Sequence, residues 1–131
     1  MRAEGWEALL HDYLLEAESR PFAWGEHDCA LWAAGWVRLS TGDDFASAWR
    51  GRYRTARGAK ALMTRRGFSG VAAIASAHLC EIPVPLAQRG DLLLHPSDSL
   101  GVCAGARGYF VTESGLLAEA ALACGRAWRV G

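Results

Sequence analysis

The feature that most constrains the fold is an almost continuously apolar segment between Ala30 and Leu39. A helix formed by this segment carries apolar side chains on nearly every side, so it has no polar face. Such a helix is buried against several neighbours, and its small residues Ala33, Ala34 and Gly35 allow adjacent backbones to approach closely. We therefore expect it to be the central element against which the rest of the chain packs.

The loop before this helix contains the residues that carry chemistry. It reads Pro21-Phe22-Ala23-Trp24-Gly25-Glu26-His27-Asp28-Cys29. Asp28 is a favourable N-cap, which places Cys29 in the first helical turn. Backbone N–H groups and the helix dipole stabilise a thiolate at that position and lower the pKa of a cysteine. Cys29 is therefore a candidate nucleophile, and a buried structural thiol is the alternative.

Size and composition indicate one folded domain. The chain has 131 residues, of which 51% are hydrophobic and 21% charged, which supports a hydrophobic core and excludes a disordered chain. We expect a single domain over residues 1–131. The 14 basic and 14 acidic residues give a formal net charge of zero, so the charge balance predicts neither nucleic acid nor an anionic membrane as a partner.

The N-terminus has no apolar signal core, and no apolar stretch is long enough to cross a membrane. We therefore expect synthesis in the bacterial cytoplasm and no membrane span. The cysteines are far apart and form no C-x-x-C pair, a spacing that predicts neither a metal site nor a cofactor. Without a secretory signal, structural disulfides are not expected either. The four cysteines are Cys29, Cys80, Cys103 and Cys124.

The first two thirds of the chain have helical periodicity. Apolar residues at helical spacing predict an amphipathic helix over residues 3–18, which ends before Pro21. We expect further helices over residues 56–66 and 71–78, a short helix from Asp43 or Asp44 to Trp49, and extended chain over residues 83–88.

A basic cluster follows the short helix, and its interpretation is structural. Arg50, Arg52 and Arg54 lie beside Trp49 and Tyr53. Guanidinium groups stack on aromatic rings and pair with carboxylates, and the acidic residues just before the cluster provide such partners. We therefore prefer this interpretation to a phosphate or nucleic-acid contact.

From residue 89 onward the pattern changes to that of strands. We expect strands over residues 90–95, 99–105, 109–112 and 126–130, while residues 116–122 fit either a strand or a helical turn. Helices followed by a small antiparallel sheet form an α+β arrangement.

The motif Phe22-x-Trp24-Gly25-x-x-Asp28-Cys29 resembles the cysteine segment of the NlpC/P60 superfamily, in the variant found in small phage and prophage proteins. Looser similarities continue through Trp49-Arg50-Gly51-Arg52-Tyr53, Gly90-Asp91-Leu92, Leu100-Gly101-Val102 and Ala127-Trp128-Arg129. The resemblance implies a papain-like α+β fold in which the cysteine helix packs on a small antiparallel sheet. It also implies a place in a phage tail or tail-like particle, with other tail, baseplate or hub proteins as partners and peptidoglycan as a further candidate partner.

A cysteine hydrolase also needs a histidine that takes the thiol proton. The resemblance places this histidine just before Leu100-Gly101-Val102, where the chain has Ser99, and the third polar residue near Val111 or Thr112. A serine hydroxyl does not titrate near neutral pH, so Ser99 cannot replace an imidazole.

Two other histidines are candidates for the missing base. If residues 96–98 connect a hairpin, His95 and Ser99 lie opposite one another with side chains on the same face. His95 would then be the catalytic base beside Cys29, oriented by Asp98 or Ser99. His27 is the second candidate, and the absence of any functional base is the third possibility.

Two functions follow from these residues. The missing histidine favours a structural or docking component of a phage tail, a pseudoenzyme in which Cys29 is an inherited core residue. The alternative is an active cysteine peptidase or amidase that degrades cell wall peptidoglycan with Cys29 as nucleophile and His95 as base. A bacterial housekeeping enzyme outside any phage context is a third possibility.

Overall fold

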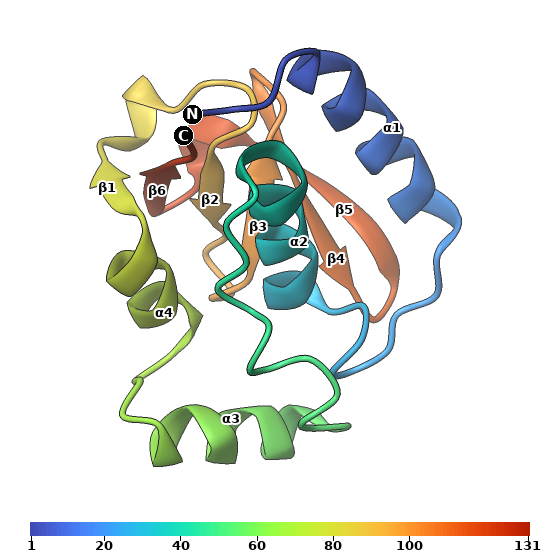
Figure 1. Ribbon diagram of the computed structural model, residues 1–131, viewed down its shortest axis with the longest axis vertical. Coiled ribbons are helices and arrows are strands. Elements are labelled where there is room, and N and C mark those ends of the chain that lie inside the picture. Colours follow the sequence, from blue (N-terminus) through green and yellow to red (C-terminus); the bar gives the residue numbers. More distant parts are fainter.

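The computed structural model describes all residues from 1 to 131 and has four helices and a six-stranded antiparallel sheet (Figure 1). The predicted α+β class is therefore confirmed. The helices are α1 (Trp6–Ser19), α2 (Cys29–Thr41), α3 (Ala56–Arg65) and α4 (Val71–His78). The strands are β1 (Cys80–Ile82), β2 (Leu92–Leu94), β3 (Leu100–Cys103), β4 (Arg107–Thr112), β5 (Gly115–Ala120) and β6 (Arg126–Arg129), in the order β1-β6-β2-β3-β4-β5.

Helix α2 is the central helix, as its sequence predicts (Figure 1). Trp36 is fully buried in the core that α2 shares with α1 and the sheet, and its indole N–H donates to the carbonyl of Gly90 at 2.8 Å. On the α1 side, the ring of Tyr13 stacks on Trp32 with 5.4 Å between centroids, and its hydroxyl donates to the Trp32 carbonyl. Aromatic burial therefore fixes both faces of α2.

The β2–β3 hairpin has the predicted register. Leu94 pairs with Leu100, and the N–H of His95 donates to the carbonyl of Ser99 at 2.8 Å. Asp98 closes the connection with a left-handed backbone, φ 64°, a conformation that aspartate tolerates better than most residues. His95 and Ser99 therefore lie opposite one another, next to the first turn of α2.

The short helix expected before residue 50 is wrong. The chain forms turns there, because the backbone makes only separate turn bonds, from the N–H groups of Trp49 and Arg50 to the Ala46 carbonyl, in place of a continuous helical ladder. One oxygen of the Asp44 side chain accepts the N–H of Ala46 at 3.2 Å, and the other contacts the guanidinium of Arg50 at 2.6 Å. The structural interpretation of the basic cluster holds for Arg50, but the guanidinium that stacks on Trp49, at 4.6 Å, is that of Arg66.

Three other local details differ from the expectation. Residues 83–88 contain a 3₁₀ turn, Val84–Leu86, in place of extended chain, because proline is compatible with the first positions of a helical turn. The three-residue strand β1 was not expected and pairs with β6 at the sheet edge. Residues 116–122, which fitted two structures, divide between β5 and the 3₁₀ turn Ala121–Ala123.

The two termini meet beside Asp91, just before the first residue of β2. The Arg2 guanidinium donates to the carbonyl of Val130 at 2.8 Å and to the buried carboxylate of Asp91 at 2.8 Å. Asp91 also accepts the backbone N–H of Val130. None of the helices combines the length and the hydropathy that a bilayer span requires.

Candidate functional site

The carboxylate of Asp28 organises the loop before α2. One oxygen accepts the N–H of Leu31 at 3.0 Å and so caps the helix, as predicted. The other accepts the N–H of Gly25 at 3.0 Å and the hydroxyl of Tyr53 at 2.6 Å. Asp28 is only 1% exposed, and three donors compensate the loss of hydration of its charge. Asp28 is therefore occupied in shaping the loop.

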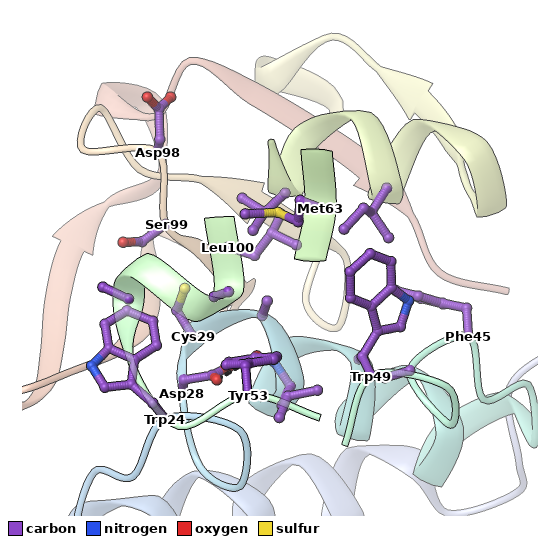
Figure 2. A pocket seen from close by; sticks show the side chains of 18 of the residues that line it. Trp24, Asp28, Cys29, Phe45, Trp49, Tyr53, Met63, Asp98, Ser99 and Leu100 are labelled. Atoms are coloured by element: carbon purple, nitrogen blue, oxygen red, sulfur yellow. Dashed lines mark hydrogen bonds between the residues drawn. The ribbon is translucent and has the colours of Figure 1, made fainter. Parts of the chain in front are cut away.

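Gly25 lies where the loop before α2 meets the segment from Trp49 to Tyr53, and this contact requires a glycine. Its backbone is left-handed, φ 83°, and a side chain there would overlap with the carbonyl oxygen of Tyr53. Its own carbonyl accepts the N–H of Gly51 at 2.8 Å. This close approach holds the segment from Trp49 to Tyr53 against the cysteine loop and places Trp24 beside Cys29 (Figure 2).

Cys29 lines a pocket of about 260 Å³ between α2, α3 and the β2–β3 hairpin (Figure 2). The residue is half-buried and belongs to none of the hydrophobic core clusters. Most of the pocket wall is apolar, with a few polar residues from the loop before α2 and from the β2–β3 connection. The wall includes Trp24, Phe45, Trp49, Tyr53, Ala59, Met63, Ile74 and Leu100, and the polar residues are Asp28, Ser97, Asp98 and Ser99. The location of Cys29 is therefore that of a site residue and not of a core residue.

The Cys29 thiol is protonated in the resting protein. Burial raises its pKa, and the neighbouring Asp28 carboxylate raises it further. Hydrogen bonds from the backbone of Leu100, the Ser99 side chain and the backbone of Ala30 oppose this effect without reversing it. The expectation that the helix terminus lowers this pKa is therefore wrong, because the enclosed position and the adjacent negative charge outweigh the helix dipole.

The imidazole of His95 does not line this pocket. Its Nδ1 accepts the N–H of Ser97 at 3.1 Å and lies 2.8 Å from the Ser97 hydroxyl. Its Nε2 lies 3.4 Å from a carboxylate oxygen of Glu119, and its ring packs edge-on against Phe110 at 5.1 Å. The register was predicted correctly, but the imidazole packs on the Phe110 face of the sheet and not toward Cys29, and Ser97 and Glu119 contact it in place of Asp98 or Ser99.

Two serines of the β2–β3 connection, Ser97 and Ser99, line the pocket. The Ser99 side chain lines the pocket together with Cys29, and its hydroxyl lies 3.4 Å from the hydroxyl of Ser97, which in turn contacts His95. The Asp98 carboxylate points away from Cys29 (Figure 2). The residue at the position of the missing histidine, Ser99, therefore lies on the wall of the same pocket as Cys29.

Sequence reasoning missed three residues of this arrangement. Tyr53 was noted only as part of the segment from Trp49 to Tyr53, and its bond to Asp28 depends on the path of the chain after Gly25. Glu119 lies in the segment whose structure the sequence left open. Ser97 could have been found, since a serine two residues after a histidine in a tight turn is well placed for a local hydrogen bond.

His27 is not part of the pocket. It is 3% exposed, and its backbone bridges to Ala23. Burial lowers the pKa of its imidazole, and the charge of Arg20 lowers it further. His27 is therefore a neutral, buried residue of the loop, although it lies only two residues before Cys29.

The remaining cysteines do not join the site. Cys80 is exposed, whereas Cys103 and Cys124 are buried, and all four thiols, including that of Cys29, are free. Burial raises the pKa of Cys103 and of Cys124. The structure brings no three histidine, cysteine or acidic side chains together in a group that holds a metal ion.

Comparison with known proteins gives one family. Searches of curated proteins and of solved structures found no match. One family model, described as "Domain of unknown function (DUF6950)", matches residues 1–130, which is almost the whole chain. The chain belongs to the DUF6950 family.

Proposed function

We propose that this protein is a cysteine peptidase or amidase of a phage tail or tail-like particle, with a papain-like fold of the NlpC/P60 type and cell wall peptidoglycan as its substrate. The phage setting and the substrate are supported by the resemblance of the segment from Phe22 to Cys29. The chemistry is supported by the arrangement of the pocket.

The observation that carries the proposal is the position of Cys29. Its sulfur lies on the wall of a pocket at the first turn of α2 (Figure 2). A pseudoenzyme that keeps this cysteine only for packing would place it in the core, among residues such as Trp32 and Trp36. The pocket also has the mainly apolar wall with a few polar groups that is typical of ligand sites.

The reaction would proceed by acyl transfer. The sulfur attacks the carbonyl carbon of the scissile amide, and a base takes the thiol proton. The amine leaves with a proton returned by the same base, and water then cleaves the thioester to regenerate Cys29. N–H groups of the first turn of α2 would stabilise the oxyanion.

The test is the release of soluble fragments from purified peptidoglycan. The wild-type protein should release muropeptide fragments, and Cys29→Ser should release none. Cys80→Ser, which removes an exposed thiol on β1, is the matched control and should retain full activity. Equal release by Cys29→Ser and the wild type would refute the proposal.

A structural or docking role in the tail is the second candidate. It is favoured by the raised pKa of Cys29 and by the absence of an imidazole from the pocket. In that role the apolar wall would contact another tail, baseplate or hub protein. Stable incorporation of Cys29→Ser into assembled particles, together with no activity in the wild type, would support this role.

A further inference from the structure

The pocket beside Cys29 offers no partner to a charged ligand group. Among the residues that line it, only Asp28 and Asp98 carry a charge. Asp28 already accepts three hydrogen bonds, from two backbone N–H groups and from the Tyr53 hydroxyl. Asp98 is exposed, and its carboxylate points away from Cys29 (Figure 2). A charged group that entered this pocket would therefore lose its hydration without gaining a partner.

Helix α3 presents one face to the pocket. Ala56, Ala59 and Met63, which are three and four residues apart, all line it, as residues on one face of a helix do. The two alanines leave room that a larger side chain would fill, and methionine is an unbranched, flexible side chain that adapts to the shape of its neighbours. Helix α3 therefore determines how much space is available beside Cys29.

The space suits an uncharged group of moderate size. The pocket has a volume of about 260 Å³, whereas an apolar cavity of about 150 Å³ is enough for one benzene molecule. The attraction between apolar surfaces is not directional, so a straight chain, a branched chain and an aromatic ring would all gain from burial here. The ligand class is therefore an uncharged apolar group and not a charged or strongly hydrated one.

The chemistry of acyl transfer decides which part of a substrate lies in the pocket. Attack by Cys29 divides an amide into an acyl group, which stays on the sulfur, and an amine, which takes up a proton and leaves. Amines released from peptides have pKa values of about 8 to 10 and are mostly cations at neutral pH. The apolar wall would not solvate such a cation. The amine therefore leaves toward solvent, and the acyl group occupies the pocket.

We propose that the pocket is an acyl subsite for an uncharged apolar acyl group, and that Ala59 and Met63 set the length of the group that it accepts. The inference rests on the proposed function, because it names the class of carbonyl compound that Cys29 attacks. It favours amide bonds whose acyl residue has an uncharged apolar side chain over bonds whose acyl residue is charged.

The test is acylation of the full-length protein by p-nitrophenyl acetate, butyrate and hexanoate at about pH 8.5, where ordinary thiols are half ionised. The Sγ–C bond forms, the bond from the carbonyl carbon to p-nitrophenolate breaks, and the thiol proton passes to the buffer. Nothing is oxidised or reduced. Because the leaving group is the same in all three esters, differences in rate report the acyl group alone.

Peptide mass mapping measures the acylation rate of each cysteine separately, at ester concentrations below saturation. Cys29 should be acylated about fourfold faster for each added CH₂ group, which is the gain expected for its full burial. The exposed Cys80 is the internal reference and should react at nearly the same rate with all three esters. A hexanoate ester with a terminal carboxylate should lose the gain at Cys29, because the pocket has no partner for the charge.

Two variants of α3 should change the length preference in opposite directions. Ala59→Leu reduces the space and should remove the advantage of hexanoate over butyrate. Met63→Ala enlarges the space and should raise the rate with the octanoate ester relative to hexanoate. Ala61→Leu, on the exposed side of α3, is the matched control and should keep the wild-type series. Far-UV circular dichroism identifies a variant that does not fold, and the wild-type series with the charged ester tests the subsite without any variant.

The outcomes separate this inference from the proposed function. Equal rates at Cys29 with the three esters, or equal rates with the charged and uncharged hexanoate esters, would overturn the acyl subsite. A wild-type length series in both folded α3 variants would overturn the roles of Ala59 and Met63. Peptidoglycan cleavage is measured separately. Cleavage without a length preference would leave the proposed function intact, whereas a length preference without cleavage would leave the subsite intact and refute the peptidoglycan substrate.

Discussion

The loop that positions Cys29 depends on one hydrogen bond, which gives the sharpest stability prediction. Tyr53→Phe removes the hydroxyl that donates to Asp28 at 2.6 Å and keeps the ring on the pocket wall. Asp28 is 1% exposed, so water cannot replace the lost donor. A hydrogen bond to a charged group contributes about 1.5–3 kcal/mol, and we expect a loss of about 2 kcal/mol in the free energy of unfolding.

The measurement is urea unfolding followed by circular dichroism, with a thermal scan as a second readout. A loss of about 2 kcal/mol corresponds to a fall of roughly 6–10 °C in Tm for a domain of this size. Tyr109→Phe is the matched control, because no hydrogen bond of the Tyr109 hydroxyl occurs in the structure, and it should change stability by less than about 0.5 kcal/mol. If Tyr53→Phe is as stable as Tyr109→Phe, Asp28 is not the anchor of this loop.

Three further predictions concern the same region. Gly25→Ala should destabilise the fold by about 3 kcal/mol or more in urea unfolding, because the added methyl combines an unfavourable φ with overlap against the adjacent main chain. Pairing with an arginine lowers the pKa of Asp44, so its contribution to stability is present above the unfolded pKa of about 4 and disappears as the pH falls through the lower folded value. Asp44→Asn should therefore be less stable than the wild type at pH 6 and equally stable near pH 2. Ala59→Trp should fill the pocket and slow alkylation of Cys29 by a bulky maleimide at least tenfold, while Ala61→Trp, on the exposed side of α3, should not.

Much of the fold was predictable because local signals agree with the tertiary structure. The apolar segment after Asp28 has no polar face, and it became the buried central helix. Asp28 was predicted as an N-cap, and its side chain accepts the N–H of Leu31. The hairpin with His95 opposite Ser99 followed from two apolar runs around a proline-containing turn. Alternation and turn residues were sufficient at these positions.

The failures have a common physical cause, which is that a tertiary contact outweighs a local preference. Asp44 accepts the N–H of Ala46 as a helix cap does, but its pairing with Arg50 closes a turn in place of a helix. Strand β1 has three residues, too few for a detectable alternation, and it exists because β6 offers a free edge.

The candidate site was predictable only in part. Cys29 at a helix terminus was read directly from the motif, whereas its raised pKa depends on enclosure by the β2–β3 hairpin and on the charge of Asp28. The register of His95 opposite Ser99 was predicted correctly, but the expected approach of its imidazole to Cys29 was wrong, because the ring packs on Phe110 on the other face of the sheet. The contacts of His95 with Ser97 and Glu119 depend on the tertiary structure and could not be predicted from the sequence.

The central claim is that Cys29 is a reactive site residue, and competitive labelling tests it most directly. The full-length protein is treated at pH 7 with a limiting amount of an acyloxymethyl ketone that carries an apolar side chain, and the modified peptides are identified by mass spectrometry. We predict that the reagent modifies Cys29 in preference to the more exposed Cys80, and that Ala59→Trp abolishes this preference. Modification of Cys80 with Cys29 left free would contradict the account.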